Sequence, residues 1–154
     1  NGEALPRYLL DIDAQLPFGD ASNTECQQAT QLSGQSGVIY GAYDGAVNNY
    51  APFDMGVCTG VEAGGPDLVY AIELEPGDEL TATVTSTVGD EVVYVLTDCP
   101  YRWDSCVAAA DKHRGAGPET LHYEHEASKQ TVYLVVDNHD PLIFGEFTLN
   151  WSVQ

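Results

Sequence analysis

Short segments of alternating apolar and polar residues, separated by turns, most constrain the fold of this chain. No stretch of twelve or more residues keeps a helical period, and 15 glycines and 8 prolines punctuate the sequence. In residues 147–153, for example, Phe147, Leu149 and Trp151 alternate with polar residues. Turns every eight to twelve residues predict an all-β fold, a jelly-roll-like antiparallel β-sandwich of about 8 strands. The expected strands are residues 38–43, 68–74, 80–85, 92–97, 107–110, 120–126, 131–137 and 147–153.

The 154 residues fit one domain with a real hydrophobic core. Residues 1–22 predict an N-terminal linker or edge segment, because proline, glycine and aspartates interrupt their pattern. Residues 23–154 are expected to form the sandwich. Within it, residues 44–66 are irregular, and a loop of that length is usually functional or needs pinning. Cys58 would pin it.

The strongly negative net charge limits the kinds of molecule that this protein can bind. The chain has 24 acidic side chains and 5 Lys plus Arg, giving a formal net charge of −19. Nucleic-acid binding is excluded in practice, because phosphate contacts need a basic face, and docking on anionic lipid is disfavoured. Solubility by self-repulsion, adaptation to salt and a Ca²⁺ site all stay open. No apolar run reaches the length of a membrane span, and an opening without Met or a basic leader indicates a removed leader or a fragment.

The four cysteines predict two disulfides, because their number is even and none forms a C-x-x-C pair. Three pairings are possible. We expect Cys99–Cys106 as a local clasp and Cys26–Cys58 as a longer staple. A four-cysteine zinc site is the alternative, which the lack of a short cysteine knuckle disfavours. Two disulfides imply an oxidising compartment, so the protein is expected to be secreted, on the cell surface or periplasmic.

No catalytic constellation stands out in the sequence. His122 and His125 lie three apart on an expected strand, so they face opposite sides of the sheet and do not readily share a metal. Ser36 lacks the G-x-S-x-G spacing of a nucleophile elbow. Nothing singles out a carboxylate pair for glycoside hydrolysis among so many acids. We therefore expect a protein that is not an enzyme.

Calcium is the best chemical hypothesis, because Ca²⁺ takes six to eight oxygens from carboxylates, amides and carbonyls in irregular loops. Taken singly, each candidate also fits an Asx turn or a solvated loop, and only their convergence in space would make a site. The candidate ligands fall in two groups, before the first strand and around the long loop. They are Asp20, Asn23, Glu25, Asp44, Asp54 and Asp67.

Aromatic side chains offer a second kind of site. Tyr101, Arg102 and Trp103 lie together between Cys99 and Cys106, and exposed Tyr and Trp stack on sugars and grip peptides. A contact with a ligand and a plug over the end of the sandwich are equally good readings of Trp103. The secondary candidates are Tyr40, Tyr43 and Tyr50.

Several motifs, in this order, suggest a family. They are residues 23–29, residues 66–70, residues 90–96 before Cys99, and residues 131–137 running on to Gly145. Over about residues 20–154 the chain resembles the bacterial pre-peptidase C-terminal domain, in its cysteine-containing secreted form. The resemblance implies a non-catalytic jelly-roll-like sandwich attached to secreted peptidases and other exported proteins.

Relatives in bacterial collagenases bind substrate and hold Ca²⁺ between an N-terminal linker and the sandwich. By this resemblance Asp67 matches the acid just before the aromatic strand, and Asp20, Asn23 and Glu25 match the linker loosely. The dense Glu/Asn cluster of the family linker is missing, and disulfides would then replace calcium as the staple.

We therefore expect a non-catalytic secreted accessory or binding module. Its partner would be a fused or associated secreted enzyme, or an extracellular polymer of protein or glycan. A free-standing lectin-like protein that binds carbohydrate through Tyr101, Arg102 and Trp103 is the alternative, and a small secreted hydrolase is less favoured.

Overall fold

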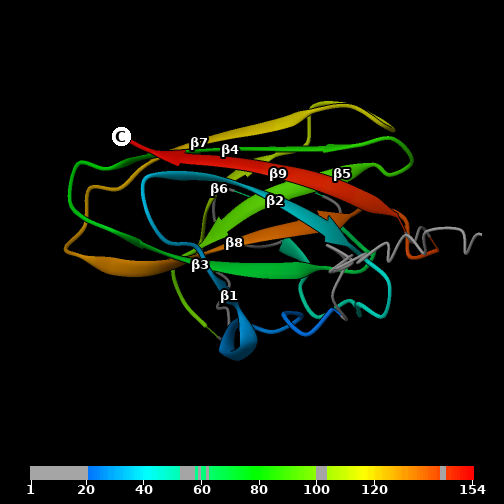
Figure 1. Cartoon of the computed structure of the whole chain (residues 1–154), viewed down its shortest axis with the longest axis horizontal. Helices are drawn as coiled ribbons and strands as arrows, with labels where there is room; N and C mark the ends of the chain where they lie inside the picture. Colours follow the sequence, from blue (N-terminus) through cyan, green and yellow to red (C-terminus); the bar gives the residue numbers. More distant parts are fainter. Residues whose placement is uncertain (1–20, 53–57, 59, 62, 100–103, 143–144) are drawn as a thin grey trace, which may run out of the picture.

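The described residues form a β-sandwich of two sheets (Figure 1). The computed structural model describes residues 21–52, 58, 60–61, 63–99, 104–142 and 145–154. One short 3-10 helix, η1 (Cys26–Gln28), precedes the strands. The strands are β1 (Thr30–Gln31), β2 (Ser36–Ala42), β3 (Leu68–Leu74), β4 (Glu79–Ser86), β5 (Glu91–Leu96), β6 (Cys106–Ala110), β7 (Glu119–Glu124), β8 (Gln130–Asn138) and β9 (Glu146–Val153).

The strand order confirms the predicted all-β class. One sheet has the order β1-β3-β8-β5-β6 and the other the order β2-β9-β4-β7. All pairings are antiparallel except that of β1 with β3, which is parallel. Each of the eight segments expected from the sequence overlaps one strand. The two-residue β1 is the addition, too short for an alternation pattern to reveal it.

A hydrophobic core fills the space between the sheets, because every second residue of a strand faces inward. In β9 the inward residues Phe147, Leu149 and Trp151 are buried, while Glu146 and Asn150 are exposed. β3, β4 and β8 add leucines, valines and an isoleucine to the same core. The pattern that predicted the strands is therefore the pattern that builds the core.

A second core lies on the outer face of the five-stranded sheet. Val92, Tyr94 and Leu96 of β5 pack there with residues of the chain that precedes β3, among them Tyr50 and Cys58. As a result all six residues of β5 are buried. A strand so covered shows no alternation, because both of its faces contact other parts of the protein.

Residues 1–20 lie outside the described residues, so the boundary near residue 22 stays a prediction. Among the described residues, no helix has the length and apolar character needed to cross a membrane.

Candidate functional site

Two segments before β3 cover the outer face of the five-stranded sheet. We call them the covering layer; they are residues 23–28 and the described part of residues 44–66. Their buried members include Cys26, Tyr50, Cys58 and Ala63. The Tyr50 hydroxyl accepts the Cys26 N–H at 2.8 Å, which ties the two segments together. The described part of the long irregular loop therefore packs against the sheet and is not a free surface loop.

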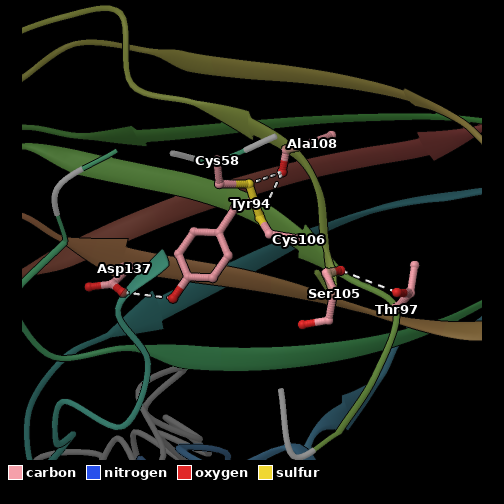
Figure 2. Close-up of a disulfide and its surroundings, with 7 residues drawn as sticks. All are labelled: Cys58, Tyr94, Thr97, Ser105, Cys106, Ala108 and Asp137. Carbon is pink, nitrogen blue, oxygen red and sulfur yellow. Dashed lines mark hydrogen bonds between the residues drawn. A yellow bond between two sulfur atoms is a disulfide. The ribbon is translucent and has the colours of Figure 1, made fainter. Parts of the chain in front are cut away.

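Both disulfides tie the covering layer to the sheet. Cys26 pairs with Cys99, and Cys58 pairs with Cys106. The expected pairing, Cys99–Cys106 with Cys26–Cys58, is therefore wrong. Cys106 is buried at the start of β6 and belongs to the outer core, where it meets Cys58 (Figure 2). Cys99 lies beyond the end of β5.

The reason for the different pairing is topological. A bond between Cys99 and Cys106 would only close the connection from β5 to β6, which the pairing of those strands already closes. The observed bonds join segments 73 and 48 residues apart in sequence, and they hold a loop layer that contributes few backbone bonds to the sheet. Cys58 does pin the long loop, as expected.

A pair of buried acids lies beneath the covering layer. Leu68 of β3 pairs with Val136 of β8, so the next residues, Asp67 and Asp137, stand opposite one another. Both are 0% exposed. Alternation places them on the outer face of the sheet, with Val69 and Val135 of the outer core.

Each acid holds a different part of the fold. Asp67 Oδ2 accepts the N–H groups of Asn49 and Tyr50 at 2.7 and 2.9 Å, so this carboxylate clamps the long loop. Asp137 Oδ2 accepts the Tyr94 hydroxyl at 2.9 Å (Figure 2), and its Oδ1 accepts the Asn138 N–H at 2.7 Å. Asp67 Oδ1 is buried without a hydrogen-bond partner.

Burial sets the protonation of these groups. Desolvation raises the pKa of Asp67 to about 7, although the N–H groups of Asn49 and Tyr50 oppose the shift. Burial, followed by the charge of Asp67, raises the pKa of Asp137 well above its usual value. Burial and the charge of Asp137 do the same to the pKa of Tyr94. Burial therefore disfavours two charged carboxylates side by side and favours a protonated carboxyl in this cluster.

The calcium candidates do not assemble a site among the described residues. Asn23 uses its Nδ2 to donate to the Val69 carbonyl at 2.9 Å, while Glu25 and Asp44 are exposed. Asp67 contributes one orphan oxygen. No group of three or more His, Cys, Asp or Glu within the described ranges could hold a metal ion. Asp20 and Asp54 lie outside the described residues, so the calcium site as a whole stays a prediction.

The aromatic candidates divide by burial. Tyr101, Arg102 and Trp103 lie outside the described residues. Two secondary candidates are core residues, which corrects the expectation that they contact a ligand: Tyr43 is fully buried against Phe147, with ring centroids 5.0 Å apart, and Tyr50 is buried in the outer core. Tyr40 is 58% exposed.

The two histidines of β7 and its end face opposite ways, as predicted. His122 is exposed, with Nδ1 3.1 Å from Thr81 Oγ1. His125 is fully buried and bonds the Ser128 carbonyl at 3.0 Å through Nε2. They do not form a shared site.

A polar hollow of about 400 Å³ lies at one end of the sandwich. It is lined by Asp90 before β5, Asp111 and Arg114 after β6, His139 after β8, and Gly60 of the covering layer. The pKa of Asp111 is raised by partial burial and then by the charges of Asp90 and Glu119. Carboxylates therefore crowd this end of the molecule.

The sequence pattern does not reveal that Asp137 and Tyr94 form a hydrogen-bonded pair. In the sequence, Asp137 is only the last residue of an expected strand. The signal that links it to Asp67 is the register of β3 against β8, which one sequence does not display.

The sequence matches no model of a known protein family, and no curated protein matches it. Solved structures share the fold, among them the following two. PliG of Aeromonas hydrophila, a periplasmic inhibitor of g-type lysozyme, has a TM-score of 0.55 and 11% identity, over 82% of this chain and 96% of that one. The pre-peptidase C-terminal domain of a collagenase from Bacillus anthracis has a TM-score of 0.50 and 15% identity, over 82% and 94%. The second fits the family resemblance drawn from the sequence at the level of fold.

Proposed function

We propose that this protein is an exported, non-catalytic module that binds a basic protein partner. The observation that carries the proposal is the charge: 24 acids against 5 Lys plus Arg on a folded, twice-disulfide-linked scaffold. An acidic surface of this strength attracts cationic proteins and speeds their association. Two disulfides support export.

The hollow at the end of the sandwich is the proposed point of contact. Asp90 and Asp111 line it, and one oxygen of Asp90 is buried without a hydrogen-bond partner. Arg114 and His139 of the same hollow offset part of the repulsion between these carboxylates, and a lysine or arginine side chain of the partner would offset the rest. The neighbours of the same fold are described as an inhibitor of an enzyme and as a domain of a collagenase, and both descriptions fit a module that acts on another protein.

Binding to a g-type lysozyme tests this function, with cytochrome c as an unrelated basic protein. We expect affinity for the lysozyme that weakens at least about tenfold between 0.1 and 0.5 M salt. Asp90→Asn with Asp111→Asn should weaken it further. Glu79→Gln with Glu124→Gln, an equal change of charge on the β4 and β7 strands, is the control. No binding to the lysozyme would refute the proposal. Equal binding of both proteins, with no difference between the two variants, would also refute it, because it would show only non-specific attraction.

Calcium stays a prediction with its own measurement. A thermal melt under non-reducing conditions and fixed ionic strength would compare Ca²⁺, Mg²⁺ and chelator. We expect a rise in Tm specific to micromolar or low-millimolar Ca²⁺, because binding only the folded state stabilises it. An equal shift with Mg²⁺, or none, would leave the acids as a solvated surface without a specific site.

A further inference from the structure

The β2 edge of the four-stranded sheet is long and carries no charge. β2 pairs with β9 on one side over seven continuous residues, without a bulge. Its sequence, SGVIYGA, holds neither a charged residue nor a proline. Natural sheets usually protect an exposed edge with a charge, a proline, a bulge or a short strand.

The other sheet edges within the described chain differ from this one. β1 has two residues, and β6 has five and is tied to the covering layer through Cys106. β7, the opposite edge of the same sheet, carries Glu119 and Glu124. In a chain with 24 acids, a seven-residue edge without one is a distinct feature.

The backbone bonds around β2 identify its free groups. Gln35 accepts the Val153 N–H at 2.7 Å, and the Tyr43 N–H donates to the Gly145 carbonyl at 3.0 Å. Since antiparallel partners alternate between bonded and non-bonded pairs, the odd-numbered residues of β2 bond to β9. The even-numbered residues therefore direct N–H and C=O away from the sheet; they are Ser36, Val38, Tyr40 and Ala42. Within the described chain, none of these groups bonds anything on that side.

The side chains of the same even-numbered residues lie on the outer face. Val38 is 52% exposed and Tyr40 58%. On the inner face, a Cβ at Gly37 would lie 2.8 Å from Trp151 Nε1, and one at Gly41 would collide with the Phe147 ring. The glycines thus make room for the side chains of Trp151 and Phe147, while Val38 and Tyr40 of β2 are turned to solvent.

We propose that the β2 edge is a docking surface for a second copy of this chain. An antiparallel pair of β2 strands about a twofold axis at Ile39 sets residue 38 opposite residue 40 of the second copy, and residue 36 opposite residue 42. Every even-numbered residue then meets another even-numbered residue, so each free N–H has a C=O opposite it. The two sheets become one continuous sheet.

The same register completes the side-chain contacts. Val38 of one copy stands beside Tyr40 of the other on the outer face, and the twofold axis repeats this pair. Aromatic and β-branched cross-strand pairs stabilise antiparallel sheets. A basic peptide finds no carboxylate on β2 itself, so a neutral strand is the better complement, and the β2 of a second copy is one.

Net charge makes this association depend on salt. Two bodies of charge −19 repel at low ionic strength. The edge is also a small interface, so the dimer should be weak. We expect monomers at about 0.05 M NaCl and a measurable dimer at about 1 M NaCl and high protein concentration.

Sedimentation equilibrium of the disulfide-bonded protein tests the proposal. Val38→Pro removes an N–H that faces away from β9, so no hydrogen bond between β2 and β9 is lost. Proline is tolerated in an edge strand at such a position. It should abolish the dimer. Val38→Glu, which changes only an exposed side chain and sets a charge beside the partner strand, should weaken the dimer at least about tenfold.

The matched control is His122→Pro on the β7 edge. His125 N–H donates to the Asp78 carbonyl, so the odd-numbered residues of β7 bond to β4 and the His122 N–H faces outward. This variant should dimerise like the original protein, and thermal melts confirm that each variant is folded. Slower exchange of the Val38 and Tyr40 amides in the dimer would support the edge directly. A monomer under all conditions, or a dimer that survives Val38→Pro and Val38→Glu, would refute the proposal.

Discussion

Asp67→Asn should stabilise the protein above pH 7 and reduce the pH dependence of its stability. The folded-state pKa of Asp67 is about 7, against a usual value of 3.8. The folded protein therefore holds a proton that the unfolded chain releases between these values. The resulting stabilisation is complete below the lower value and is lost as the pH rises through about 7.

The amide keeps the useful contact and removes the charge. Its oxygen can accept the N–H groups of Asn49 and Tyr50, and its NH₂ group would occupy the place of the orphan Oδ1. Relief of the buried charge should be on the order of 1–3 kcal/mol at pH 8. The advantage should shrink as the pH falls below 7 and disappear below about 3.8, where Asp67 is neutral in both the folded and the unfolded chain.

Urea unfolding in the presence of chelator, repeated from pH 5 to pH 8, measures the effect. Asp44→Asn is the control, because this substitution removes the same charge at an exposed position. A slope should remain in Asp67→Asn, since the pKa values of Asp137 and Glu91 are also raised. If Asp67→Asn and the original protein gave parallel stability curves, Asp67 would not hold the proton.

Removing either disulfide should destabilise the protein strongly. On the chain-entropy relation, loops of 48 and 73 residues each correspond to about 4 kcal/mol. The paired changes are Cys58→Ala with Cys106→Ala, and Cys26→Ala with Cys99→Ala. Each should lower the denaturant midpoint under non-reducing conditions.

Hydrogen exchange separates a global from a local effect. Loss of the Cys58–Cys106 bond should speed exchange most at Asn49 and Tyr50, whose amides bond Asp67 in the long loop. The β4–β9 pair of the other sheet serves as the internal control. Faster exchange in β4 and β9 without a change at Asn49 and Tyr50 would contradict the role assigned to the covering layer.

The strands could be predicted because their signal is local. Phe147, Leu149 and Trp151 alternate in sequence as they alternate across the sheet. The disulfide pairing could not, because Cys58 and Cys106 meet only after a loop folds back over a sheet that already has another core beneath it. The Asp67–Asp137 pair depends on strand register, so its two members look like isolated loop and strand-end acids in the sequence.

The burial of individual tyrosines could not be predicted from the sequence either. Tyr40 and Tyr43 lie three residues apart in one expected strand, so alternation sets them on opposite faces without telling which face is the core. In the structure Tyr40 is exposed, while Tyr43 is buried and donates to the Asp137 carbonyl at 3.1 Å. The number of tyrosines in a sequence is therefore a poor guide to a binding surface, because only the exposed rings can contact a ligand.

The covering layer is attached to the five-stranded sheet by two disulfides, by Asp67, by packing and by a few hydrogen bonds such as those between Asn23 and Val69, rather than by strand pairing. Its buried residues, among them Cys26, Tyr50 and Cys58, have to fit the outer core. Asp44, Val47 and Asn48 are exposed. In evolution or in engineering, these exposed positions should therefore accept new side chains while the sheet beneath stays unchanged.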